Sequence, residues 1–158
     1  MASPARNLAS AVRVRRAPLR MLHHYPWRMG VGTEKYVNIT TFTASGEEKT
    51  TPVWITDLAD GRVGFCTAAD SWKVRRISRD PAVRLQPCDR RGNPPAGSAI
   101  VAGAAEVLAE DSDGFREVRA GIDAKYGLAA RAAKAQLWVQ GLLGRSEAKR
   151  CAVVIRLE

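Results

Sequence analysis

Four cationic side chains lie close together near the middle of this sequence. Lys73, Arg75, Arg76 and Arg79 fall within seven positions, in the segment "SWKVRRISR" that begins at Ser71. A helix that begins near Ser71 places Lys73 and Arg76, three residues apart, on one side. The N–H groups of its first turn, the Ser71 hydroxyl and the Lys73 ammonium then form an anion site suited to phosphate.

Thr67, at the end of the preceding apolar run, is expected to donate a further hydrogen bond to the same anion. Asp70 would oppose an anion, so we expect it to cap the helix instead. These residues alone leave a second interpretation open, in which the cations form a solvated basic face of a helix. A third interpretation is a nucleic-acid surface, which would require a basic face interleaved with exposed aromatic residues.

The residues before this segment alternate with the period of half-buried strands. Val37 and Ile39, Val53 and Ile55, and Val63 and Phe65 each alternate with polar or small residues. The separators "ASGEEK" and "DLADGR" contain the glycine and acidic residues of hairpin turns. The sequence therefore predicts three strands that form an antiparallel meander.

The cationic helix is expected to face this sheet through Val74 and Ile77 and to end before Pro81. Two further strands are predicted, in "AVRLQPC" (82–88) and in "GSAIVAGAAEVL" (97–108). The segment "CAVVIRLE" (151–158) predicts a final strand.

Two helices are predicted between the last two strands. The first begins after "DSDG" and carries one apolar stripe, with Gly127 as its C-cap, and the second runs to about Leu143. The stripe consists of Phe115, Val118, Ile122 and Tyr126. Sequential antiparallel strands with short inserted helices favour a single domain that is mainly β, a small and partly open barrel.

Composition and charge place the positive excess outside this domain. The chain has 158 residues and a formal net charge of +9, but residues 1–33 hold six arginines and no acidic residue. We therefore expect a basic, flexible N-terminal extension (1–33), a domain (34–158) of net charge +3, and no nucleic-acid partner. Without a run of eighteen apolar residues, no membrane span is expected.

Cysteine and histidine usage limits the chemistry. The three cysteines are odd in number, widely spaced and without a C-x-x-C motif, as expected for reduced thiols in the cytoplasm. Both histidines, His23 and His24, lie in the extension, so we expect no metal site and no histidine-based triad. Cys66 and Cys88 are expected to be inert, Trp72 interfacial or partly exposed, and Tyr126 part of the core.

Several motifs resemble one family of proteins. They are Thr-Thr-Phe in the first strand, Pro-Val-Trp in the second, the run Thr-x-x-x-Ser-x-Lys-x-x-Arg from Thr67, Asp-Pro-x-Val, Pro-Cys-Asp, and "AKYG" at 124–127. Residues 34–158 are similar to the split β-barrel family related to pyridoxamine 5′-phosphate oxidase. Within that family they resemble the actinobacterial branch that uses the deazaflavin coenzyme F420.

The resemblance implies a cofactor site and a homodimer, with the pocket between two subunits. Lys73 and Arg76 would hold the cofactor phosphate, and Thr67 and Ser71 would be neutral donors. The residues implied to border the flat ring are Pro52, Val53, Trp54 and Pro87. Trp54 also has a purely structural alternative, in which it packs beneath a loop.

The implied activity is that of an F420H2-dependent oxidoreductase, which transfers a hydride between the deazaflavin and a small organic acceptor. No catalytic residue is assigned, because in such enzymes the cofactor carries the chemistry. Two alternatives stay open: an FMN-dependent oxidoreductase, and a flavin- or deazaflavin-binding protein without turnover.

Overall fold

The computed structural model describes residues 30–142 and 149–158. In these residues seven strands and two helices follow one another along the chain. The elements are β1 (Tyr36–Phe42), β2 (Glu48–Val53), β3 (Thr56–Asp57), β4 (Val63–Ala68), α1 (Trp72–Arg79), β5 (Ala82–Cys88), β6 (Val101–Ala109), α2 (Asp113–Leu142) and β7 (Arg150–Leu157).

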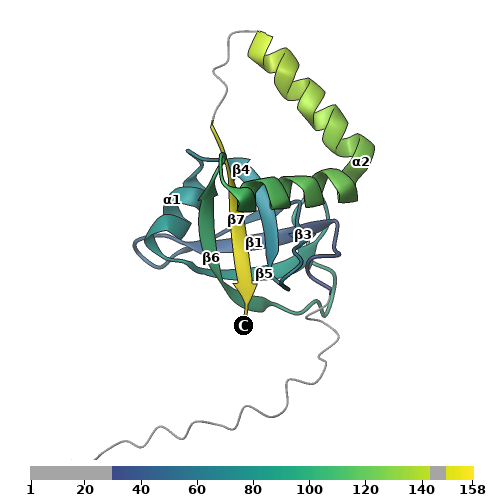
Figure 1. The fold of residues 1–158 in the computed structure, drawn as a ribbon. Helices are drawn as coiled ribbons and strands as arrows, with labels where there is room; N and C mark the ends of the chain where they lie inside the picture. The colour runs from purple at the N-terminus through teal and green to yellow at the C-terminus, as the bar shows by residue number, and fades with distance from the viewer. Residues whose placement is uncertain (1–29, 143–148) are drawn as a thin grey trace, which may run out of the picture.

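The strands form one antiparallel sheet in the order β2-β1-β5-β6-β7-β4-β3. Its two edge strands, β2 and β3, are separated along the chain by only Trp54 and Ile55. Three peptide steps span at most about 11 Å, so the sheet must curl until its edges approach each other. The result is the partly open barrel seen in Figure 1.

The predicted meander is wrong in one respect. The second strand pairs with the first, but the third predicted strand, β4, pairs with β7 and with the short β3. The run that was predicted as one strand around Val53 and Ile55 is two strands, one at each edge of the sheet. Alternation of side chains shows that a segment is extended, but not which neighbour it pairs with.

Most of the later elements match the sequence pattern closely, but β6 begins at Val101 and not at Gly97. Strand β5 covers the predicted residues, and α1 begins after Ser71, buries Val74 and Ile77 and ends before Pro81. The final strand is also present, beginning at Arg150. These elements were predictable because their signals are local: periodicity, a cap residue and a proline.

Two apolar layers hold the barrel together. The interior contains Phe65, Leu85 and Ile155 at 0% exposure, together with Ile77 from α1. The predicted stripe of Phe115, Val118, Ile122 and Tyr126 is buried between α2 and the outer face of the sheet.

A break at Gly127 divides α2 into two parts. Gly127 has φ 46° and ψ −114°, as suits the predicted C-cap glycine. The first part lies across the sheet, and the second runs away from it (Figure 1).

Val31, assigned to the extension, is 2% exposed and belongs to the barrel core. All three cysteines are free thiols, with Cys66 and Cys88 half-buried and Cys151 buried. None of the helices in the described segments is both long and apolar enough to cross a membrane.

Candidate functional site

The N-terminus of α1 gathers three of the residues predicted for the anion site. The Lys73 ammonium donates to the Thr67 hydroxyl across 3.2 Å, so α1 and the end of β4 are joined at this point. Ser71, and not Asp70 as we expected, occupies the N-cap position, and its hydroxyl makes no capping hydrogen bond. That hydroxyl oxygen is buried, and within the described residues it has no partner. Because buried polar atoms are normally paired, it is suited to a ligand atom.

Arg76 joins the same cluster from the next turn of α1. Its Nε donates to the hydroxyl of Thr41, 2.8 Å away on β1. Thr41 is 1% exposed and was missed at the sequence level. Its signal was a hydroxyl residue at an inward-facing position, in register with Val37 and Ile39. We call Thr67, Ser71, Lys73 and Arg76 the cradle. Thr41 is not part of it, but its hydroxyl holds Arg76 in place.

The electrostatics of the cradle favour an anion. Within residues 30–142 and 149–158, no carboxylate forms an ion pair with Lys73 or Arg76. Burial lowers the pKa of Lys73 below its usual 10.5, and the neighbouring Arg76 lowers it further. Both effects disfavour the charged ammonium, so a bound anion would stabilise it.

The other two cations of the segment lie outside the cradle. Arg75 lies over the indole of Trp72, 4.8 Å from the ring centroid, and Trp72 is 70% exposed, as predicted. Arg79 donates to the carbonyl of Phe42 across 2.7 Å. Only two of the four cations that drew attention in the sequence therefore face the candidate site.

The residues predicted to border a ring lie at the other end of the barrel. Val53 and Pro87 both pair with Val37, on either side of it, whereas Thr41 near the cradle is four residues further along β1. At about 3.3 Å per residue, the two groups are about 13 Å apart along the strand. Pro52 pairs with Asn38 and thus points to the opposite face from Val53.

Trp54 lies between β2 and β3 rather than within a strand. Its indole stacks on the ring of Tyr126, with centroids 4.6 Å apart and planes 13° from parallel. Tyr126 is buried, as predicted, so one face of the half-buried Trp54 is occupied from within the chain. A ring ligand would contact its other face or its edge.

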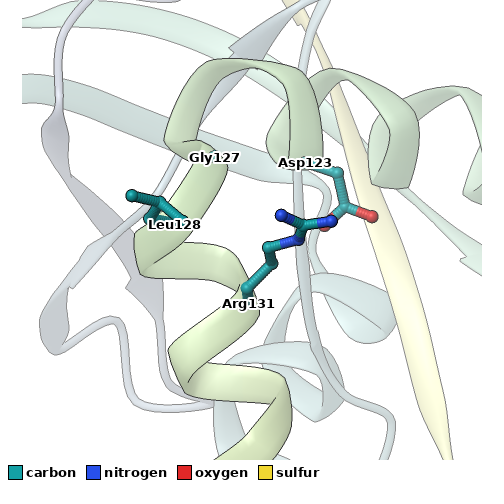
Figure 2. Close-up of a pocket in the computed structure, with 4 residues that line it drawn as sticks. All are labelled: Asp123, Gly127, Leu128 and Arg131. Atoms are coloured by element: carbon teal, nitrogen blue, oxygen red, sulfur yellow. The ribbon is translucent and has the colours of Figure 1, made fainter.

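A separate pocket lies where α2 breaks at Gly127. It has a volume of about 450 Å³ and is lined by Asp123, Gly127, Leu128 and Arg131. In Figure 2 the side chains of Asp123 and Arg131 extend toward each other, and Leu128 points away. None of the residues predicted for cofactor binding lines it.

No family model matches the sequence, and a comparison with curated proteins gives no match. Solved structures do match, each at low identity. A conserved hypothetical protein of Mycobacterium tuberculosis has a TM-score of 0.58 and 21% identity, over 83% of this chain and 78% of that one. An F420 reductase has a TM-score of 0.53 and 17% identity, over 81% and 90% of the two chains.

A third structure with the same fold is the heme storage protein HutZ of Vibrio cholerae. Its TM-score is 0.56 at 13% identity, over 84% of this chain and 85% of that one. The predicted split β-barrel is therefore confirmed, and the resemblance stated from the motifs holds at the level of the fold.

Proposed function

We propose that the protein is an F420H2-dependent oxidoreductase that transfers a hydride between the deazaflavin and a small organic acceptor. The observation that carries the proposal is the cradle. It combines a buried, unpartnered Ser71 hydroxyl with two cations, Lys73 and Arg76, that no carboxylate of the described chain neutralises. A phosphate would satisfy all three groups at once.

The residues present fit such a cofactor. Lys73 and Arg76 would contact its phosphate, with Ser71 and Thr67 as neutral donors. When bound, a reduced deazaflavin supplies a hydride. The chain's own contribution is to bind and orient the cofactor, to exclude water from the ring and to leave one ring face open to an acceptor. No side chain is proposed as a general acid or base.

The separation of the two predicted groups suits an elongated cofactor. A compact anion would use the cradle alone, whereas a ring joined through a chain to a phosphate can contact both ends of β1. Val53 and Pro87, side by side across Val37, would then border the ring, together with Trp54. Pro52, on the opposite face, would contribute through the backbone of the same strand end.

A second copy of the chain is proposed to complete the pocket. A row of residues, Thr50, Thr40, Arg84 and Ala102, runs across β2, β1, β5 and β6 on one face of the sheet. Three of these four side chains are exposed, and α2 packs instead on β3, β4, β6 and β7. Ala104 is also exposed on β6, and small side chains at Ala102 and Ala104 would let another sheet approach closely.

Light scattering at micromolar concentration should give twice the monomer mass, and a monomer mass with cofactor present would exclude the dimer.

The cofactor assignment is tested by titrating the purified protein with F420, FMN, FAD and haem side by side. We expect F420 to bind most tightly. One of the structures that share the fold is an F420 reductase, which supports this expectation. Comparable or tighter FMN binding would replace it with an FMN-dependent oxidoreductase.

Turnover is tested separately by following the absorbance of reduced F420 in the presence of candidate acceptors. A steady loss supports the reductase. Tight binding with no loss for a broad panel of acceptors would favour a cofactor-binding protein without turnover. Free thiols at all three cysteines suit the proposed cytoplasmic location.

A further inference from the structure

The open side of the barrel depends on two residues, Trp54 and Ile55, which we call the crossing segment. They leave β2 at one edge of the sheet and enter β3 at the other. Ile55 therefore has no strand ladder to satisfy its backbone N–H and carbonyl groups, although its side chain is 0% exposed. Buried backbone groups require partners, and here side chains must provide them.

Tyr126 provides the first of these partners. Its hydroxyl accepts the Ile55 N–H at 2.9 Å and lies 3.0 Å from the Ile55 carbonyl oxygen. The same hydroxyl is 2.8 Å from the carbonyl oxygen of Lys35, just before β1. Burial raises the pKa of this phenol, which keeps the donor proton in place. One hydroxyl thus joins the crossing segment to the start of β1.

Lys125 provides the second partner. Its ammonium donates to three backbone carbonyls, those of Gly32, Glu34 (2.6 Å) and Ile55 (2.7 Å). An ammonium has three donors, so these carbonyls use all of them. The pKa of Lys125 is lowered by burial, while Asp57 and Glu34 act in the opposite direction. The side chain is fully engaged in holding the backbone.

The backbone of α2 and the Trp54 ring complete this arrangement. The positive φ of Gly127 ends the first part of the helix directly after Tyr126, so the two side chains project from its last turn. The face of Tyr126 meanwhile stacks on Trp54. Both residues of the crossing segment are therefore held from α2, one through its ring and one through its backbone.

We propose that Lys125 and Tyr126 are positioning residues that fix the crossing segment and thereby place Trp54 and the end of β2 against the cofactor ring. The proposal rests on the proposed function, because the ring is the ligand that this end of the barrel would contact. It assigns to "KYG" a role distinct from the cradle, which lies at the other end of β1.

The decisive variant is Tyr126→Phe. It removes the hydroxyl that meets Ile55 and Lys35 but keeps the ring that stacks on Trp54. Lys125→Met removes the tripod of hydrogen bonds and keeps a long side chain, and Lys49→Met is its control, since Lys49 is exposed on β2. Hydrogen exchange is measured for the Ile55 amide and, as an internal reference, for the amides of β4.

We expect the Ile55 amide of Tyr126→Phe to exchange at least about tenfold faster than in the wild type, with β4 unchanged. Affinity for F420 or FMN should fall about three- to tenfold, the effect of one lost hydrogen bond. Affinity for inorganic phosphate, which needs only the cradle, should stay within about twofold. Lys125→Met should behave likewise and Lys49→Met like the wild type.

Unchanged exchange at Ile55 would refute the hold on the crossing segment. Faster exchange with full cofactor affinity would refute the positioning role. An equal loss of phosphate affinity would mean general damage to the fold and would also overturn it. If the wild type binds inorganic phosphate but neither F420 nor FMN, the proposed function fails and the positioning role with it, while the exchange data still decide whether Lys125 and Tyr126 hold Ile55.

Discussion

Replacement of Lys73 by alanine tests the cradle directly. The ammonium is half-buried and donates to Thr67, and no carboxylate of the described residues pairs with it. If it also donates to a phosphate, its removal deletes one charge-assisted hydrogen bond, worth about 1.5–3 kcal/mol. The dissociation constant of the cofactor should rise roughly ten- to a hundredfold. The fold should survive, because Val74 and Ile77 supply the buried face of α1.

The assay is a fluorescence or calorimetric titration with F420, FMN and inorganic phosphate. Arg75→Ala is the matched control, since Arg75 is an exposed cation two positions away that lies over Trp72. It should change affinity by no more than a few tenths of a kcal/mol. Arg79 is a poorer control because it holds the Phe42 carbonyl. Lys73→Arg should recover only part of the affinity, because a planar fork does not replace a compact ammonium.

Wild-type affinity in Lys73→Ala, for both the cofactor and phosphate, would refute the cradle. The cations of α1 would then face water, as the simplest interpretation of the sequence allows. A loss in Arg75→Ala that matches the loss in Lys73→Ala would instead point to a diffuse electrostatic attraction. High salt would then screen that attraction and abolish phosphate binding.

Three further predictions concern pH, packing and the N-terminal segment. Because the pKa of Lys73 is lowered from 10.5, phosphate affinity should fall as the pH rises through that lowered value, and calorimetry should show no such decline in Lys73→Ala. Gly64→Ala places a methyl group 2.6 Å from a Val118 methyl carbon. Urea unfolding should therefore show a free energy of unfolding lower by about 1–3 kcal/mol. An unchanged free energy of unfolding would mean that α2 shifts to accommodate the methyl group. Deletion of residues 1–28 should leave the melting temperature unchanged. Deletion of residues 1–34 also removes Val31 and two carbonyls that Lys125 binds, so it should clearly lower the melting temperature. Equal melting temperatures for the two deletions would contradict this prediction.

The separation between contacting residues explains how much of the site could be predicted from the sequence. Thr67 and Lys73 are six residues apart, so a strand end followed by a helix start was enough to place them together. Arg76 and Thr41 are 35 residues apart, and their contact depends on which strand lies beneath α1. Lys125 and Ile55 are 70 residues apart, and no local pattern announces their hydrogen bond.

The fold also divides into locally determined elements and long-range pairings. Strand β5 and helix α1 were predicted almost to the residue from alternation, capping and Pro81. The division between β2 and β3 was missed because the alternation continues through Trp54 and Ile55 without interruption. Pairing is decided by long-range packing, which places Val53 and Thr56 at opposite edges of one sheet. The order of antiparallel strands and short helices indicated a small, partly open barrel, and the resemblance to a known family specified it as a split β-barrel.

The position of β7 in the sheet has a consequence for biosynthesis. It is the seventh strand to be synthesised, yet it lies between β6 and β4, and its Val153 and Ile155 are fully buried. While the ribosome still holds residues 150–157, the strands fall into two groups, β2-β1-β5-β6 and β4-β3. The edges of β6 and β4 that β7 will pair with are then unpaired. Such edges are prone to wrong pairing with other chains. The barrel therefore closes only once residues 150–157 have left the ribosome, and chaperone dependence in the cell should reflect that interval.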